Sequence, residues 1–155
     1  MLLLAMVSLS FVVLSTPAVA QDVMIEVTTL KAKGRGRSDP ELRRLRSDLR
    51  RLAGYRAFKL VDEQRRTCRW QDPQEFRLPG GRRLYLRPKR LADERVVMQV
   101  RMLHGTRELV DTNVRMRDQG TLFFGMHRGD GLDDGALLIM LKTGLPVRHA
   151  VSEVP

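Results

Sequence analysis

Side chains that could act as nucleophiles or bases are few and widely separated in this chain. After residue 20, no serine lies in the Gly-x-Ser-x-Gly turn of serine hydrolases; these serines are Ser38, Ser47 and Ser152. No two histidines have the i, i+4 helical spacing that zinc proteases use; the 3 histidines are His104, His127 and His149. The sequence therefore offers neither a serine-hydrolase nor a zinc-protease motif.

Cys68 is the only cysteine, which excludes an internal disulfide and a zinc site built on several thiolates. It lies between Thr67 and Arg69, and neighbouring cations favour the reactive thiolate. The alternative is a small, partly buried side chain, which we favour. A thiol dyad with His104 or His127 has no supporting motif around it.

Three short stretches resemble ligand-binding motifs only in part. Asp130-Gly-Leu-Asp-Asp134 is acidic like a calcium loop, but it lacks the alternating ligand spacing and the terminal Glu. Arg128-Gly129-Asp130 spells an integrin-binding tripeptide without any other adhesive feature, and Gly34-Arg35-Gly36 lacks the Gly-Lys-Ser/Thr of a phosphate loop. We therefore predict no catalytic residue, no cofactor, no metal site and no enzymatic activity.

The basic residues are concentrated in one part of the chain. Lys and Arg number 28 against 18 Asp and Glu, which gives a formal net charge of +10. Residues 31–90 hold 20 bases and 7 acids, whereas residues 91–155 hold 8 bases and 9 acids. Such asymmetry favours an anionic partner such as a lipid head group, lipopolysaccharide or a cell-wall polymer. The alternative is a solvated basic surface without a partner.

Nucleic acid is a poor candidate partner, because few aromatic side chains remain to stack on bases once the alternating core positions are filled. If the basic segment binds an anion, we expect a site made by a loop and the helix that follows it. Backbone N–H groups at a helix N-terminus favour anions, and arginines one turn apart extend the same surface. The predicted anion-binding residues are Arg35, Arg37, Arg43, Arg46 and Arg50.

Residues 39–53 carry the pattern of one amphipathic helix. Ser38 and Glu41 have the spacing of a capping box, Pro40 suits the first turn, and Gly54 suits the end. Apolar residues at spacings of three and four form one stripe that must be buried. This stripe consists of Leu42, Leu45, Leu49 and Leu52, and the other faces carry Arg43, Arg44, Arg46, Arg50 and Arg51.

Elsewhere the apolar residues alternate with a period of two, which is typical of strands. Residues 24–30 form the first expected strand, residues 31–37 a basic loop, and a short strand contains Phe58 and Leu60. Pro79-Gly80-Gly81 reads as a hairpin turn. Further strands are expected at residues 76–78, 84–86, 96–103, 110–117, 122–126 and 136–142. Their short connections predict a β-rich α+β fold, mainly an antiparallel meander, as a β-sandwich or half-open barrel with one helix packed on it.

Residues 1–20 have the features of a cleavable secretory signal. Leu2 to Leu14 form an apolar run of 13 residues, shorter than the roughly 20 that span a bilayer. Ala18-Val19-Ala20 then predicts cleavage before Gln21; the alternative is an uncleaved anchor. We expect an exported chain, periplasmic or secreted, with one domain over residues 21–142, a flexible tail over residues 143–155 and no transmembrane segment after cleavage.

Four short stretches resemble small exported bacterial proteins of unknown function. The stretches are Val27-Thr28-Thr29-Leu30, Asp39-Pro40-Glu41-Leu42, Leu78-Pro79-Gly80-Gly81 and Glu108-Leu109-Val110-Asp111-Thr112. The resemblance implies no particular activity. The function we expect is that of an exported, non-enzymatic binding or envelope-assembly protein, whose partner is an anionic envelope component or another envelope protein. The alternatives are a dedicated polyanion binder and an unrecognised enzyme.

Overall fold

Eight strands form two four-stranded antiparallel sheets in the computed structural model, which describes residues 22–50, 52, 55–93, 95–126 and 135–145. The first sheet has the order β2-β1-β8-β7 and contains β1 (Val23–Lys33), β2 (Ala57–Cys68), β7 (Thr121–Met126) and β8 (Ala136–Gly144). The second sheet has the order β3-β4-β5-β6 and contains β3 (Gln74–Leu78), β4 (Arg82–Ala92), β5 (Arg95–His104) and β6 (Arg107–Arg117).

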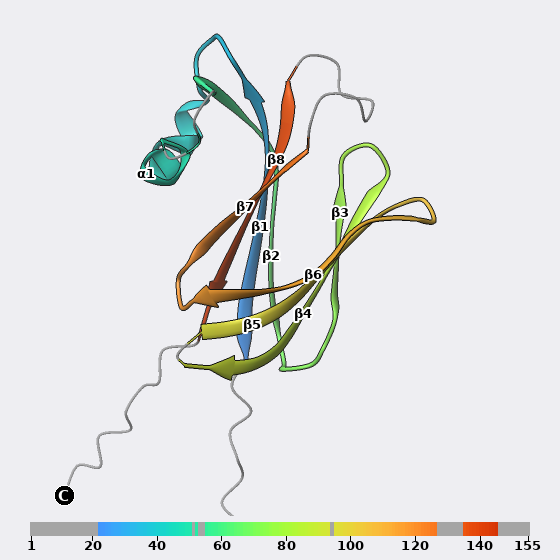
Figure 1. Cartoon of the computed structure of the whole chain (residues 1–155). Helices are drawn as coiled ribbons and strands as arrows, with labels where there is room; N and C mark the ends of the chain where they lie inside the picture. Colours follow the sequence, from blue (N-terminus) through green and yellow to red (C-terminus); the bar gives the residue numbers. More distant parts are fainter. Residues whose placement is uncertain (1–21, 51, 53–54, 94, 127–134, 146–155) are drawn as a thin grey trace, which may run out of the picture.

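The two sheets lie face to face, as Figure 1 shows, so the predicted β-rich, mainly antiparallel fold is confirmed, and the two sheets do not close into a barrel. The second sheet is a simple meander in sequence order. In the first sheet, β1 and β8 are the central neighbours, and Met24 lies opposite Gly144. The predicted turn at Pro79-Gly80-Gly81 joins β3 to β4, and both glycines have positive φ.

Alternation along the strands produces the main core between the sheets. On β1, Val23, Ile25 and Val27 point inward and are fully buried. Their neighbours are buried side chains of the second sheet and of β8, among them Phe76, Leu84, Leu86, Met98, Val100, Leu137, Ile139 and Leu141. A second apolar cluster covers the other side of the first sheet and consists of Leu30, Ala32, Leu42, Leu45, Leu49, Phe58, Leu138 and Met140.

The single helix expected over residues 39–53 is wrong in length and type. A 3-10 helix, η1 (Pro40–Leu45), is followed by one α-helical turn, α1 (Arg46–Leu49). The leucine spacing is compatible with this change, because Leu42 and Leu45 are three apart, as in a 3-10 turn, while Leu45 and Leu49 are four apart. Leu42, Leu45 and Leu49 are buried, so the predicted apolar stripe is confirmed for three of its four leucines, and Leu52 is half-buried.

Several strands are longer than the sequence pattern indicated. β1 continues to Lys33, so Lys31 and Lys33 belong to a strand and not to the expected basic loop. β2 continues to Cys68 through a β-bulge, where Val61 is the extra residue between the pairs Thr29–Asp62 and Leu30–Leu60. β8 continues to Gly144. The expected signal, most of the Gly/Asp loop at 128–135 and most of the tail lie outside the described residues.

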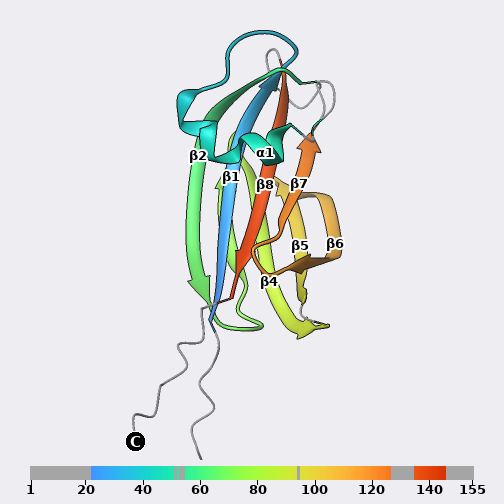
Figure 2. The ribbon, with the colours of Figure 1, turned by 90° about the vertical axis from the view of Figure 1, so that its left-hand side faces the viewer.

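The helical turns lie across the outer face of β1 and β8 near one end of the first sheet (Figure 2). Within the described ranges, no helix is long and apolar enough to cross a membrane.

Candidate anion-binding site

The connection between β1 and β2, residues 34–56, leaves and returns to the same point of the first sheet. Lys33 pairs with Ala57 across the two strands, and the Arg56 backbone N–H donates to the Lys33 carbonyl at 3.0 Å. The two ends of the connection are therefore hydrogen-bonded to each other. Its two helical segments lie over the outer face of the sheet (Figure 2).

Ser38 and Asp39 fix this connection to β2. The Phe58 N–H donates to Ser38 Oγ at 3.1 Å, and the Leu60 N–H donates to an Asp39 carboxylate oxygen at 2.9 Å. The Asp39 N–H in turn donates to the Phe58 carbonyl at 3.0 Å. The capping box expected from Ser38 and Glu41 is therefore wrong: Asp39 is the N-cap residue, and no side chain caps the helix. These bonds instead occupy polar groups on the edge of β2, which would otherwise be open to another strand.

A hollow of about 810 Å³ lies within the connection. Five of its lining residues are arginines, and we call it the arginine hollow; they are Arg37, Arg43, Arg46, Arg50 and Arg56. Arg43, Arg46 and Arg50 follow the same change of spacing, three and then four, as the leucines one position before them. They therefore stay on one side of the helical segment, next to the buried stripe. The Arg50 N–H donates to the Arg46 carbonyl at 3.1 Å, which fixes these two residues one turn apart.

None of the five arginines has a side-chain hydrogen bond, ion pair or ring contact with another residue that the structure describes. All five are exposed. The hollow also includes one carboxylate, that of Asp39, and one of its oxygens already accepts the bond from Leu60. Because five guanidinium groups gather around one concavity with a single carboxylate, the local potential is positive and attracts anions.

The floor beneath the arginines is apolar. Leu42, Leu49 and Phe58 are buried, while Leu52 and Tyr55 are only half-buried. The ring of Tyr55 meets that of Phe58 edge to face, with the ring centres 6.4 Å apart. The site thus combines permanent positive charge at its rim with apolar surface at its base.

The structure brings together four of the five arginines predicted from the sequence: Arg37, Arg43, Arg46 and Arg50 all line the hollow. Arg35 is exposed and is not one of its lining residues. Arg56 was missed, because its position just before β2 gives no sign that β2 returns beside the helix. The helix N-terminus was also expected to help bind the anion. This expectation is wrong, because a 3-10 segment followed by one α-helical turn has only a very small dipole.

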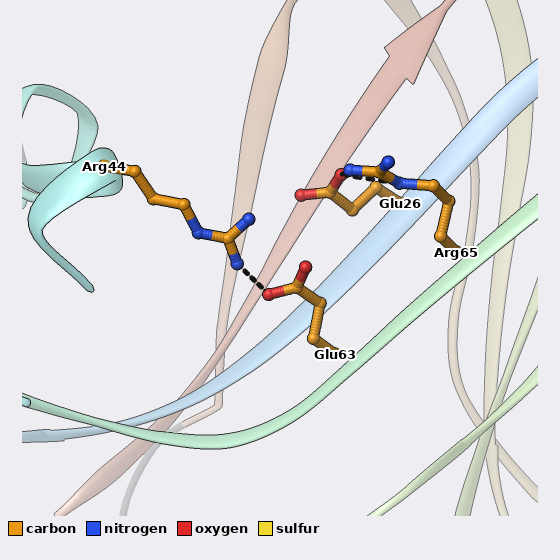
Figure 3. A network of polar contacts seen from close by, with 4 residues as sticks. All are labelled: Glu26, Arg44, Glu63 and Arg65. Atoms are coloured by element: carbon orange, nitrogen blue, oxygen red, sulfur yellow. Dashed lines mark hydrogen bonds and ion pairs between the residues drawn. The ribbon is translucent and has the colours of Figure 1, made fainter. Parts of the chain in front are cut away.

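A separate polar network ties the helical segment to the outer face of the first sheet (Figure 3). Arg44 is hydrogen-bonded to Glu63 of β2 and, unlike the five hollow arginines, is not one of the residues that line the hollow. Beside it, Arg65 Nε donates to Glu26 at 3.1 Å, and Glu26 is buried with only 5 % of its side chain exposed. This hydrogen bond and the charge of Glu26 raise the pKa of the Arg65 guanidinium.

Cys68 is buried at the end of β2, and desolvation, with smaller effects of Asp72 and Asp22, raises the pKa of its thiol to about 11. The thiolate interpretation is therefore wrong, and the interpretation as a small buried residue holds. His104 is exposed at the end of β5, whereas His127, His149 and residues 130–134 lie outside the described residues. In the described part of the chain, no three His, Cys, Asp or Glu side chains are grouped as metal ligands.

Comparison of the chain with protein-family models, with curated proteins and with solved structures finds no match. A proposal for its function therefore rests on the geometry of the arginine hollow.

Proposed function

We propose that this protein is an exported, non-enzymatic binding protein and that its ligand is anionic and binds in the arginine hollow. The observation that supports the proposal is the gathering of Arg37, Arg43, Arg46, Arg50 and Arg56 around one concavity without protein partners among the described residues. Guanidinium groups present paired N–H donors that match carboxylate and phosphate oxygens. An anion in the hollow would give these donors the acceptors that the chain itself does not provide.

The polar groups of the hollow favour binding over catalysis. An arginine keeps its proton at any physiological pH, so it cannot serve as a general base. The hydroxyl of Ser38 and the carboxylate of Asp39 both accept backbone hydrogen bonds from β2, and this role is structural. The lining thus provides groups that hold an anion but no base poised to activate a nucleophile.

Export is proposed from the sequence alone, from the apolar run Leu2 to Leu14 and the Ala18-Val19-Ala20 site. N-terminal sequencing of the protein recovered from cells tests it: a start near Gln21 in a soluble exported fraction supports export, and an intact Met1 in a membrane pellet contradicts it. In that compartment the available anions include lipid head groups, lipopolysaccharide and cell-wall polymers.

The binding test compares two double charge reversals with the same change in net charge. Arg46→Glu/Arg50→Glu alters the hollow, and Arg77→Glu/Arg115→Glu alters two exposed arginines of the second sheet that also lack a described partner. The probes are heparin and phosphatidylglycerol vesicles, each at low and high salt. We expect wild-type binding that weakens with salt, because exposed charges are screened over about 8–10 Å at physiological ionic strength.

The hollow reversal is expected to weaken binding by at least about tenfold, as the loss of one or more charge-assisted hydrogen bonds implies. The control reversal is expected to weaken it by less than about threefold, because it changes only the long-range field. Absence of wild-type binding at low salt, or equal losses for the two reversals, would contradict the proposal. Circular dichroism of both variants shows whether either change has disturbed the fold.

A further inference from the structure

We propose that the ligand of the arginine hollow is an anionic amphiphile, a single phosphate or carboxylate head group on an apolar chain, rather than a purely polar anion. This inference rests on the proposed function, since it names the class of anion that the same site would take. It is drawn from the floor of the hollow, which a polar anion would leave unused.

The floor is formed by apolar side chains that the rest of the protein does not fully cover. Leu52 and Tyr55 are half-buried, although they border the second apolar cluster, which contains the buried Leu49 and Phe58. They pack against that cluster on one side and line the hollow on the other. An apolar chain in the hollow would remove this surface from water, and each methylene so buried strengthens binding by about fourfold.

The positive charges come from more than one segment and lie at the rim. Arg43 and Arg46 belong to the helical segments and Arg50 is the C-cap of α1, while Arg37 comes from the preceding loop and Arg56 is the residue before β2. All five are exposed, whereas the apolar residues between these segments are buried or half-buried. A ligand with its charge at one end and its apolar part below is complementary to this order of groups. The volume of about 810 Å³ also falls within the range of small-molecule sites.

The head group fixes one end of the ligand and the floor recognises the other. A planar guanidinium binds phosphate or carboxylate with two parallel hydrogen bonds, so two of the rim arginines can hold one head group. A zwitterionic head group brings a cation to the same rim and is disfavoured there by like charge. The site should therefore distinguish amphiphiles by head-group charge as well as by chain length.

The test is calorimetric titration of the purified protein with four probes, of which the amphiphiles are kept below their micelle concentrations. The probes are dodecyl phosphate, octyl phosphate, inorganic phosphate, and dodecylphosphocholine, which has the dodecyl chain and a zwitterionic head. We expect dodecyl phosphate to bind at least about tenfold more tightly than inorganic phosphate or dodecylphosphocholine, and the affinity for octyl phosphate to lie between those for dodecyl phosphate and inorganic phosphate. Circular dichroism at the highest probe concentration verifies that the protein remains folded.

Two variants separate the floor from the rim. Leu52→Ser is expected to lower the ratio of the affinity for dodecyl phosphate to that for inorganic phosphate, because it removes apolar surface from the floor. Its control is Leu103→Ser, which changes a half-buried leucine on the outer face of the second sheet and should leave this ratio as it is in the wild type. Arg46→Gln/Arg50→Gln is expected to weaken the binding of both phosphate probes, with Arg77→Gln/Arg115→Gln as its control.

Each possible outcome bears on a different claim. Equal affinities for dodecyl phosphate and inorganic phosphate would contradict the inference that the ligand is an amphiphile, but would agree with the proposal that the hollow binds an anion. Loss of all binding, to these probes and to heparin, would overturn the proposed function itself. If dodecyl phosphate binds tightly and Leu52→Ser does not weaken this binding, the dodecyl group binds outside the floor of the hollow, and the inference is overturned. Binding to anionic vesicles without binding to monomeric dodecyl phosphate would also overturn the inference, because the arginines would then bind head groups at a lipid surface and the floor would bind no apolar chain.

Discussion

The two sheets share one core but differ in their outer faces. The outer face of the first sheet is apolar at one end, where the helical segments cover it, and the five arginines of the hollow have no described side-chain partners, although Arg44 of the same cover is bound to Glu63. The outer face of the second sheet has no helix over it in the described structure (Figure 1), and several of its arginines bind neighbours on the same face or its margins. Arg101 pairs with Glu108 at 2.8 Å, and Arg87 donates to the Gln71 carbonyl at 3.0 Å.

Both faces are thus rich in arginine, and the difference between them lies in what the guanidinium groups contact. On the second sheet, some arginines have an acid, a carbonyl or a ring of a neighbouring residue within reach, as when Arg83 lies over the ring of Tyr85, while Arg77 and Arg115 have no described side-chain partner. On the first sheet, five arginines of the β1–β2 connection line a concavity, while Arg44 of the same connection binds Glu63 on β2. The comparison teaches that basic composition alone does not distinguish the two faces, whereas the arginines that line the hollow without described side-chain partners do, and the proposed binding site rests on them.

The largest expected effect comes from placing a charge in the cover of the first sheet. Leu45→Asp would bury an unpaired carboxylate where a leucine is only 6 % exposed. Leucine-to-alanine changes at core sites cost about 2–5 kcal/mol, and a buried charge without a partner costs more. We therefore expect urea unfolding to show loss of the folded domain.

Its control is Leu103→Asp on the outer face of the second sheet, where the leucine is half-buried and no helix covers it in the described structure. The expected cost is about 1 kcal/mol, near the centre of the range for single substitutions. Similar losses for the two variants would show that the outer faces do not differ as described.

The next largest effect should separate the ion pairs of the two faces. Arg65→Ala leaves the Glu26 carboxylate buried without its ionic partner, whereas Arg101→Ala breaks a pair whose side chains are 49 % and 45 % exposed. An exposed pair contributes no more than about 1 kcal/mol. We expect thermal unfolding of Arg65→Ala at a clearly lower temperature than that of Arg101→Ala. The reverse order would mean that Glu26 is adequately solvated without Arg65.

The dependence of the free energy of unfolding on pH tests a group in the interior, the Cys68 thiol, and not the outer faces. The Cys68 thiol has a pKa raised from 9.0 to about 11 by burial, so in the folded state it keeps its proton where an unfolded chain would lose it. The unfolded state then binds fewer protons, and the free energy of unfolding should fall as the pH rises from about 9 to about 11.

Cys68→Ala removes this titration, so the slope of stability against pH in that window should be shallower for the variant than for the wild type. Denaturant unfolding at several pH values measures both slopes. Identical slopes would show that the thiol is as well solvated when folded as when unfolded.

The smallest effect is expected at the β-bulge of β2. Val61 is the extra residue there, and 45 % of it is exposed, so its side chain contributes little to either apolar cluster. Val61→Thr should change the free energy of unfolding by no more than about 0.5 kcal/mol. A larger loss in denaturant unfolding would mean that the cover of the first sheet extends further along β2 than the described contacts indicate.

The parts of this fold that local sequence determines were predictable. The alternation along β5 and β6, the turn at Pro79-Gly80-Gly81 and the leucine stripe all follow from periodicity and turn chemistry. Most of β2 was not predictable, because residues 62–67 are polar on both faces, and such a stretch resembles a loop unless its position at a sheet edge is known. The helix was overestimated because leucine spacings of three and four fit a continuous α-helix as well as a 3-10 turn followed by an α-turn.

The candidate site likewise combines a feature that local sequence predicts with one that only the tertiary structure determines. The stripe of Arg43, Arg46 and Arg50 is a local feature that spacing reveals. The hollow itself depends on tertiary contacts, since Ser38 and Asp39 bind the start of β2 and bring Arg56 beside the helical segment. The sequence contains the charges, but only the folded chain shows that four predicted arginines share one concavity and that Arg35 is not among its lining residues.

The central pairing of the first sheet also has a consequence for the order of folding. β1 is synthesised first and β8 last, yet they are hydrogen-bonded neighbours along nine residue pairs, from Met24–Gly144 to Ala32–Ala136. Until β8 emerges, β1 has only β2 beside it, and β7 has no strand to join in that sheet. Contacts so distant in sequence fold slowly, because the chain between them must first be closed into a loop. For a chain proposed to be exported, this topology keeps the sheet incomplete until the last strand has crossed the membrane.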